Sequence, residues 1–134
     1  MLRNRNLGLA IIALVSLVGL QTSGCSNSSS NSNDIAFTCV SDPQPPRVGI
    51  NSFRVTLATS GGERVAGARI SLEGGMSHSG MGPVFGEAKE VAPGRYQGTL
   101  ELNMRGDWIV MFHVTLAGGR TFDRQVEIQN IQAA

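Results

Sequence analysis

From residue 35 onward the sequence predicts an all-β fold, and three observations support this prediction. Apolar and polar residues alternate with a period of two, which is the pattern of a half-buried strand. Glycine and proline interrupt the alternation about every ten residues, and no segment shows helical periodicity. About seven short strands within roughly 100 residues are typical of an immunoglobulin-like β-sandwich, which is the architecture that we expect.

The first three strands follow from this alternation. Residues 35–40 form a short apolar run, which the proline-rich segment 42–46 ends. Residues 48–59 then place apolar side chains on one face and polar side chains on the other. A glycine pair turns the chain into residues 65–73, which alternate in the same way.

Four more strands complete the predicted sandwich. Residues 83–91 form a short strand, and a Pro-Gly turn leads into residues 96–104, which show the cleanest alternation and place Met104 on the apolar face. Residues 108–116 are apolar on both faces, which predicts a central strand. A second glycine pair then leads into a last strand over residues 122–128.

The N-terminus has the features of a targeting segment. Two arginines precede an apolar run at residues 7–20, which is too short to span a membrane and is typical of a signal peptide. Small residues directly before Cys25 resemble a bacterial lipobox, in which the signal is cut before the cysteine and the thiol is acylated. The alternative is an ordinary secretory signal that leaves Cys25 as a free thiol, because Thr22 stands where a lipobox usually has an aliphatic residue.

The sequence therefore divides into three segments. We expect a lipoprotein signal peptide at residues 1–24, a lipidated cysteine with a Ser/Asn-rich tether at residues 25–33, and the β-sandwich at residues 34–134. The lipid would make the membrane a partner and place the domain in the cell envelope, facing outside the cytoplasm. In a Gram-negative cell, Ser26 after the cysteine would fit the periplasmic side of the outer membrane.

Charge and motifs argue against two functional classes. The chain has 11 basic and 10 acidic residues, and removal of the first 24 residues takes two arginines with it, which leaves nine against ten. No basic stripe remains, so we expect no nucleic-acid partner. We find no nucleophile with a nearby base, no zinc-protease motif and no phosphate-binding loop, so we expect that the protein is not an enzyme.

A glycine-bounded loop carries the strongest chemical signal. Met76, His78 and Met81 lie within six residues, and thioether sulfur beside imidazole favours monovalent copper. In an extended segment, Met76 and His78 point to the same side, and Gly80 would allow Met81 to fold back toward them. The alternative is that both methionines pack at an open end of the sandwich while His78 is a solvated loop residue.

A second pair of candidate ligands lies on the strand at residues 108–116. Met111 and His113 share one face of this strand, although packing of a central strand explains them equally well. One site could use both His78 and His113 only if the Met/His loop folds over this strand. The predicted metal ligands are therefore Met76, His78, Met81 and His113, with Cu(I) as the possible cofactor.

Acylation of Cys25 would leave Cys39 without a disulfide partner. Cys39 lies in an apolar run, so we interpret it as a small buried hydrophobic residue. The alternative is a thiol that binds metal or forms a mixed disulfide.

Five motifs, in order, resemble those of the YtkA-like and FixH-like domains. The resemblance covers about residues 44–130, and similar domains also occur attached to metal-efflux adaptors of the CusB type. It implies an immunoglobulin-like sandwich outside the cytoplasm with an accessory role in copper handling, cytochrome oxidase assembly or efflux. FixH-type members hold this domain on a transmembrane helix, whereas the anchor expected here is a lipid. The motifs are PRVGxNxFRVxL at residues 46–57, VAGARI at 65–70, MSHSGMGPV at 76–84, PGRY at 93–96 and LxMRGDW at 102–108.

Two functional hypotheses follow from the sequence. The first is a lipid-anchored envelope module that binds copper through the Met/His loop and assists metal handling or efflux. The second is a metal-free interaction module of an envelope complex, such as a partner of a transporter or an oxidase-assembly protein.

Overall fold

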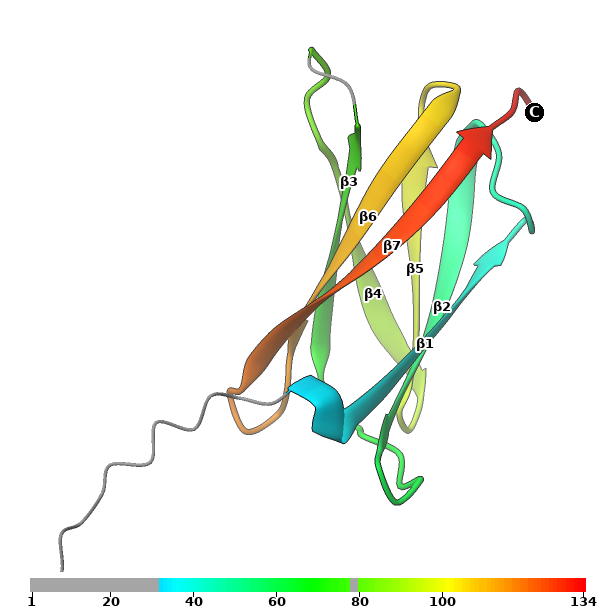
Figure 1. Ribbon diagram of the computed structural model, residues 1–134. Coiled ribbons are helices and arrows are strands. Elements are labelled where there is room, and N and C mark those ends of the chain that lie inside the picture. Colours follow the sequence, from blue (N-terminus) through cyan, green and yellow to red (C-terminus); the bar gives the residue numbers. More distant parts are fainter. Residues whose placement is uncertain (1–31, 78–79) are drawn as a thin grey trace, which may run out of the picture.

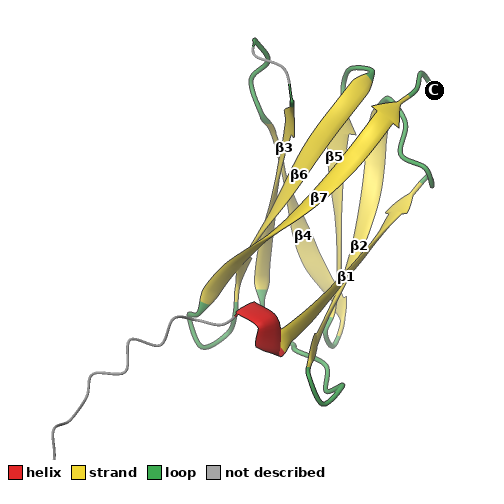
Figure 2. Cartoon of the chain, viewed as in Figure 1, coloured by secondary structure: helices red, strands yellow, loops and turns green. Residues whose placement is uncertain are grey.

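The computed structural model describes residues 32–77 and 80–134, so the predicted signal peptide, Cys25 and His78 lie outside the described residues. Seven strands and one short 3-10 helix form the described chain, as Figure 2 shows. No helix among these residues is long and apolar enough to cross a membrane. The elements, labelled in Figure 1, are η1 (Ser32–Asp34), β1 (Ile35–Asp42), β2 (Gly49–Thr59), β3 (Arg69–Met76), β4 (Val84–Ala92), β5 (Arg95–Leu102), β6 (Gly106–Thr115) and β7 (Thr121–Ile131).

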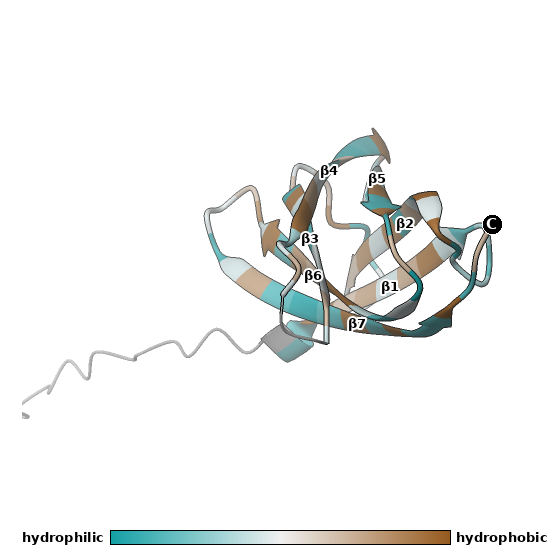
Figure 3. Cartoon of the chain, turned by 90° about the horizontal axis from the view of Figure 1, so that it is seen from above, coloured by the Kyte–Doolittle hydropathy of each residue, from teal (hydrophilic) through white to brown (hydrophobic). Residues whose placement is uncertain are grey.

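The strands pair in the order β1-β2-β5-β4-β3-β6-β7, and every pair is antiparallel. The groups β1-β2-β5-β4 and β3-β6-β7 correspond to the two layers of an immunoglobulin-like sandwich. Because β4 pairs with both β5 and β3, the two layers join into one sheet that curls around its interior (Figure 3). The predicted all-β, seven-stranded, immunoglobulin-like fold is confirmed.

The core forms on the inner face of this curled sheet. Every second residue of β5 is buried, and Trp108, Val110 and Phe112 are buried in β6, as their alternation predicts. The ring of Phe112 lies 5.2 Å from that of Phe37 and 6.0 Å from that of Phe53, so aromatic contacts join β6 to β1 and β2 across the interior.

Two predictions about buried side chains were wrong. Met104 is 43% exposed, because β5 ends at Leu102 and the following turn directs the Met104 carbonyl toward the indole N–H of Trp108, which donates to it at 3.0 Å. The strand β6 lies between β3 and β7 as expected for a central strand, but only one of its faces is buried. The outer face, which includes Met111 and His113, is partly exposed, as is common in antiparallel sheets.

The strand β3 begins four residues later than predicted, because a buried tyrosine holds the preceding backbone. The hydroxyl of Tyr96 donates to the carbonyl of Val65 at 2.7 Å and accepts from the amide of Ala68 at 3.1 Å. The amide of Gly67 donates to the carboxylate of Glu90 at 3.0 Å. Three backbone groups of this segment therefore bond to side chains, and the amide of Val65 donates to the carbonyl of Leu57 on β2 at 3.0 Å instead of pairing with β4 or β6.

The two edge strands, β1 and β7, face each other across a gap that we call the seam. Six antiparallel steps separate them in the sheet, so they run in the same direction. The seam is tied at one end by an ion pair between Asp34 and Arg120 at 2.9 Å, and at the other by a hydrogen bond from the amide of Val48 to the carbonyl of Gln132 at 3.0 Å.

Between these ties the seam holds a groove of about 300 Å³, and Cys39 is one of its lining residues. Cys39 is partly buried and packs against the core, and this burial raises the pKa of its thiol to about 11. A protonated, half-buried thiol agrees with the interpretation of Cys39 as a small hydrophobic residue.

The sandwich has two ends with different surfaces. At one end, which we call the tether end, η1 leads into β1. At the opposite end, which we call the hairpin end, lie the β3–β4 connection, the β5–β6 connection and the C-terminus (Figure 1). Several large apolar side chains are exposed at the hairpin end: Ile50 at 73%, Phe85 at 71%, Met104 at 43% and Met81 at 38%.

Candidate functional site

The Met/His loop is the connection of the β3–β4 hairpin, between Met76 and Val84. The base of the loop is held to the neighbouring strand by a hydrogen bond of 3.4 Å from the amide of Ser77 to the carbonyl of Asp107. At its far side Gly80 has a φ of 115°, a backbone conformation that favours glycine. Met81 follows directly after this glycine, and the expectation that Met81 folds back toward Met76 and His78 stays a prediction, because His78 lies outside the described residues.

The two methionines of this loop have different surroundings. Met76 continues the inner face of β3, which also carries Ile70 and Leu72, and it packs against the core at a position opposite Trp108. This contact is what the packing alternative predicted for Met76. Met81 follows Gly80, and its side chain is exposed. The loop thus offers one thioether at the mouth of the sandwich and one on its surface.

His113 lies in a different part of the molecule from Met76. His113 pairs with Ser71 of β3, whereas Met76 lies five residues further along that strand, which corresponds to about 17 Å. The two side chains also point to opposite faces of the sheet, because Met76 packs on the core and His113 lies on the outer face. The structure therefore does not bring Met76 and His113 into one site.

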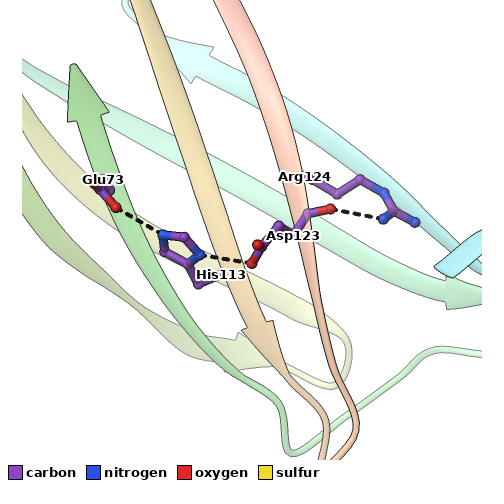
Figure 4. A network of polar contacts seen from close by, with 4 residues as sticks. All are labelled: Glu73, His113, Asp123 and Arg124. Atoms are coloured by element: carbon purple, nitrogen blue, oxygen red, sulfur yellow. Dashed lines mark hydrogen bonds and ion pairs between the residues drawn. The ribbon is translucent and has the colours of Figure 1, made fainter. Parts of the chain in front are cut away.

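His113 instead lies between two carboxylates (Figure 4). Its Nδ1 is 2.8 Å from Oδ1 of Asp123 on β7, and its Nε2 is 3.1 Å from Oε2 of Glu73 on β3. The hydrogen bonds to Asp123 and then to Glu73 raise the pKa of His113, because both carboxylates favour the imidazolium, and partial burial lowers it by less. We call these three residues the imidazole clamp.

Sequence reasoning missed the two carboxylates of the imidazole clamp. The glycine turn between β6 and β7 sets the register that places Asp123 opposite His113, so this pair could have been found from the hairpin alone. Glu73 is opposite Met111 in a pairing between strands far apart in sequence, which no local signal reveals.

A polar cleft of about 530 Å³ lies beside the imidazole clamp on the outer faces of β3, β4 and β6. His113 forms part of its wall, together with Ser71, Arg69, Glu87 and Lys89. Among the described residues, no three histidine, cysteine, aspartate or glutamate side chains are grouped so that they could hold a metal ion.

Together, these features define a small β-sandwich module. A profile of the YtkA-like family matches residues 29–113, which is more than half of the chain, so the protein belongs to this family. The resemblance seen in the sequence is therefore confirmed, and the matched region includes the whole β3–β4 hairpin. Membership of the family indicates an extracytoplasmic accessory domain. A search of curated proteins found no match.

Proposed function

We propose that this protein is a lipid-anchored accessory module of the cell envelope that binds Cu(I) through the β3–β4 loop. Met76, His78 and Met81 would be the ligands, and the module would assist metal handling or efflux. The observation that carries this proposal is the hairpin itself, because it presents two thioethers on a glycine-rich loop at the open end of the sandwich, one of them exposed. Thioether sulfur is a soft ligand that favours Cu(I) over harder cations.

The ligand chemistry leads to a specific expectation about selectivity. Thioethers carry no proton at any accessible pH, so their binding of Cu(I) releases none, whereas an imidazole binds only in its neutral form. The loop should therefore prefer Cu(I) to Zn(II), and its affinity should fall only modestly in mild acid.

The position of the loop also fits this role. The chain enters β1 at the tether end, and the β3–β4 loop lies at the hairpin end of the sandwich (Figure 1). A domain anchored through Cys25 would therefore hold the loop away from its own membrane attachment, where a pump or an oxidase-assembly protein could exchange metal with it.

A Cu(I) competition titration under reducing conditions tests this proposal. The matched samples are residues 32–134, the double variant Met76→Leu/Met81→Leu, and Met104→Leu as a control that removes an exposed thioether elsewhere at the hairpin end. We expect one-to-one binding that the double variant loses and the control retains, with the circular dichroism of all three unchanged. Equal binding by the double variant would exclude these ligands.

A second candidate function is supported by a separate observation. Ile50 and Phe85 are large apolar side chains at the hairpin end, and both are more than two-thirds exposed. Exposed apolar residues that gather in one region often mark a contact surface. The domain would then be a metal-free interaction module that docks on another envelope protein. Metal content after exposure to copper separates the two functions, because a module of this second kind should contain none.

A further inference from the structure

A pocket of about 340 Å³ lies on the outer face of the sheet where β1, β2 and β5 are adjacent, and three arginines line it. Arg54 comes from β2, Arg95 begins β5, and Arg64 lies in the connection between β2 and β3. We call this feature the arginine pocket. Neither the β3–β4 loop nor the imidazole clamp contributes a residue to its wall, so it is a separate feature of the surface.

The register of the strands brings the three arginines together. Arg95 is opposite Thr56, and Arg64 forms a bridge with Ala58. Residues 54, 56 and 58 of β2 alternate with buried residues and point to the outer face, and paired residues share a face. The arginine side chains therefore project from neighbouring positions on one surface. Because they come from three separate segments, no basic stripe is visible in the sequence.

No counter-charge balances these arginines within the described chain. None of the residues that line the pocket is acidic. Among the residues that the structure describes, no hydrogen bond or ion pair joins any of the three guanidinium groups to a protein group. The carboxylate of Glu90, which precedes the pocket residue Val91, instead accepts from the amide of Gly67 at 3.0 Å. Like charges at neighbouring sheet positions repel one another, so the arrangement favours an anion bound among them.

The side chains of the arginine pocket indicate the chemistry of its ligand. Arginine suits a phosphate group well, because its planar guanidinium donates two parallel hydrogen bonds to phosphate oxygens. The wall also has an apolar part, since it includes Val40 and Val91, which are 39% and 62% exposed. A ligand that fits both features carries a phosphate group next to an apolar group.

The arginine pocket extends toward the tether end of the sandwich. The strand β2 ends at Thr59, opposite Ile35, and β5 begins at Arg95, near the end where η1 leads into β1 (Figure 1). In a domain anchored through Cys25, as proposed above, this end is close to the membrane surface, where phospholipid headgroups present phosphate at high density. This step rests on the proposed anchor, whereas the charge and the volume of the pocket do not.

We propose that the arginine pocket binds the phosphate group of an ester, with Arg54, Arg64 and Arg95 donating to its oxygens and the two valines contacting its apolar part. A phospholipid headgroup and a small soluble phosphate ester share this group. The position of the pocket and its exposed valines favour the phospholipid. Binding uses no residue of the Cu(I) loop, so the copper proposal and this one can fail separately.

Nitrogen-15 NMR of the arginine side chains tests this site in the full chain, held in a nonionic detergent. The probes are glycerol phosphate and dihexanoyl phosphatidylglycerol, added separately. We expect the Nε–H resonances of the three pocket arginines to shift and saturate. Saturation by phosphatidylglycerol alone identifies a lipid headgroup as the ligand, and saturation by glycerol phosphate identifies a soluble ester, so both results support the site.

Matched variants separate the arginine pocket from the overall charge of the domain. Arg54→Gln/Arg95→Gln removes two of the proposed donors, and we expect it to weaken binding at least about tenfold, because hydrogen bonds between charged groups are lost. Arg105→Gln removes the same charge from the exposed turn between β5 and β6 at the hairpin end, and it should retain the affinity of the wild type.

Three results would overturn the proposal: no saturable shift with either probe, equal affinity of the wild type and the double variant, or an equal loss of affinity in Arg105→Gln. Thermal melts without ligand supply an independent check. Because like charges repel, the double variant should melt no lower than the wild type. A fall in Tm would show that these arginines stabilise the fold through protein partners, which would also overturn the proposal.

Discussion

The hydroxyl of Tyr96 gives the sharpest prediction about stability, because one atom satisfies two backbone groups. Tyr96 is only 1% exposed, and its hydroxyl bonds to the carbonyl of Val65 and to the amide of Ala68. Burial raises the pKa of the phenol further above neutrality, so the group remains protonated and continues to donate at physiological pH. Replacement by phenylalanine keeps the ring in the core and removes these two hydrogen bonds together with the contact of the hydroxyl with the Glu90 carboxylate.

The expected cost follows from the groups left behind. A backbone donor or acceptor that loses its partner while buried costs about 1–3 kcal/mol, and partial access of water to this segment lowers the total, so we expect Tyr96→Phe to reduce the free energy of unfolding by about 2 kcal/mol. In a domain of about 100 residues this corresponds to a fall in Tm of roughly 8–15 °C. Urea denaturation and differential scanning calorimetry measure the two quantities independently.

A matched control identifies the hydroxyl as the cause. Thr99→Val removes an exposed hydroxyl from the same strand, and it should change stability by less than about 0.5 kcal/mol. If Tyr96→Phe also costs less than about 0.5 kcal/mol, the two hydrogen bonds do not hold the segment before β3, and the explanation for the late start of that strand fails.

Three further predictions concern other parts of the sheet. A Cβ at Gly98 would lie 2.6 Å from the carbonyl oxygen of Glu87, so Gly98→Ala should destabilise the fold by about 1–3 kcal/mol in urea melts, whereas Gly118→Ala, which meets no atom within 4 Å, should be nearly neutral. The pKa of His113 is raised in the fold, so its ion pairs with Asp123 and Glu73 add to the free energy of unfolding. This contribution is complete below the pKa of the unfolded histidine and is lost as the pH rises through the folded pKa. We therefore expect His113→Gln to lower the free energy of unfolding by less than about 1 kcal/mol, because the ion pairs are exposed. The loss should be larger near pH 5 than near pH 9, and equal losses at the two pH values would contradict a raised pKa for His113. With its pKa raised to about 11, the Cys39 thiol should react with an alkylating reagent at neutral pH far more slowly in the folded chain than in urea, and equal rates in a thiol assay would show that it is not protected.

Much of the fold could be predicted from the sequence, because the alternation of apolar residues decides which face of each strand is buried. The same rule places Met76 on the core face of β3 with Ile70 and Leu72, as the structure shows. The ends of strands were less predictable, since a distant residue decides them. The start of β3 depends on Tyr96, and the exposure of Met104 depends on the indole of Trp108.

Local sequence patterns predict only one of the two carboxylate contacts of the imidazole clamp. Asp123 is opposite His113 across a short hairpin, and a register drawn from the glycine turn would have paired them. Glu73 reaches His113 only because β3 pairs with β6, and the 29 residues from Met76 to Met104 carry no signal for that register. The methionine and histidine residues suggested a metal site, but the carboxylate partners of His113 depend on how the strands pair.

The seam has a consequence for how this protein behaves among its own copies. An unpaired sheet edge is a template on which another chain can add a strand, and an anchored protein meets its neighbours at high density in two dimensions. Here each edge strand turns its open side toward the other, and ties at both ends keep the gap narrow. The two unpaired edges thus shield each other, so a domain anchored as we propose is protected against edge-to-edge association into fibres along the membrane.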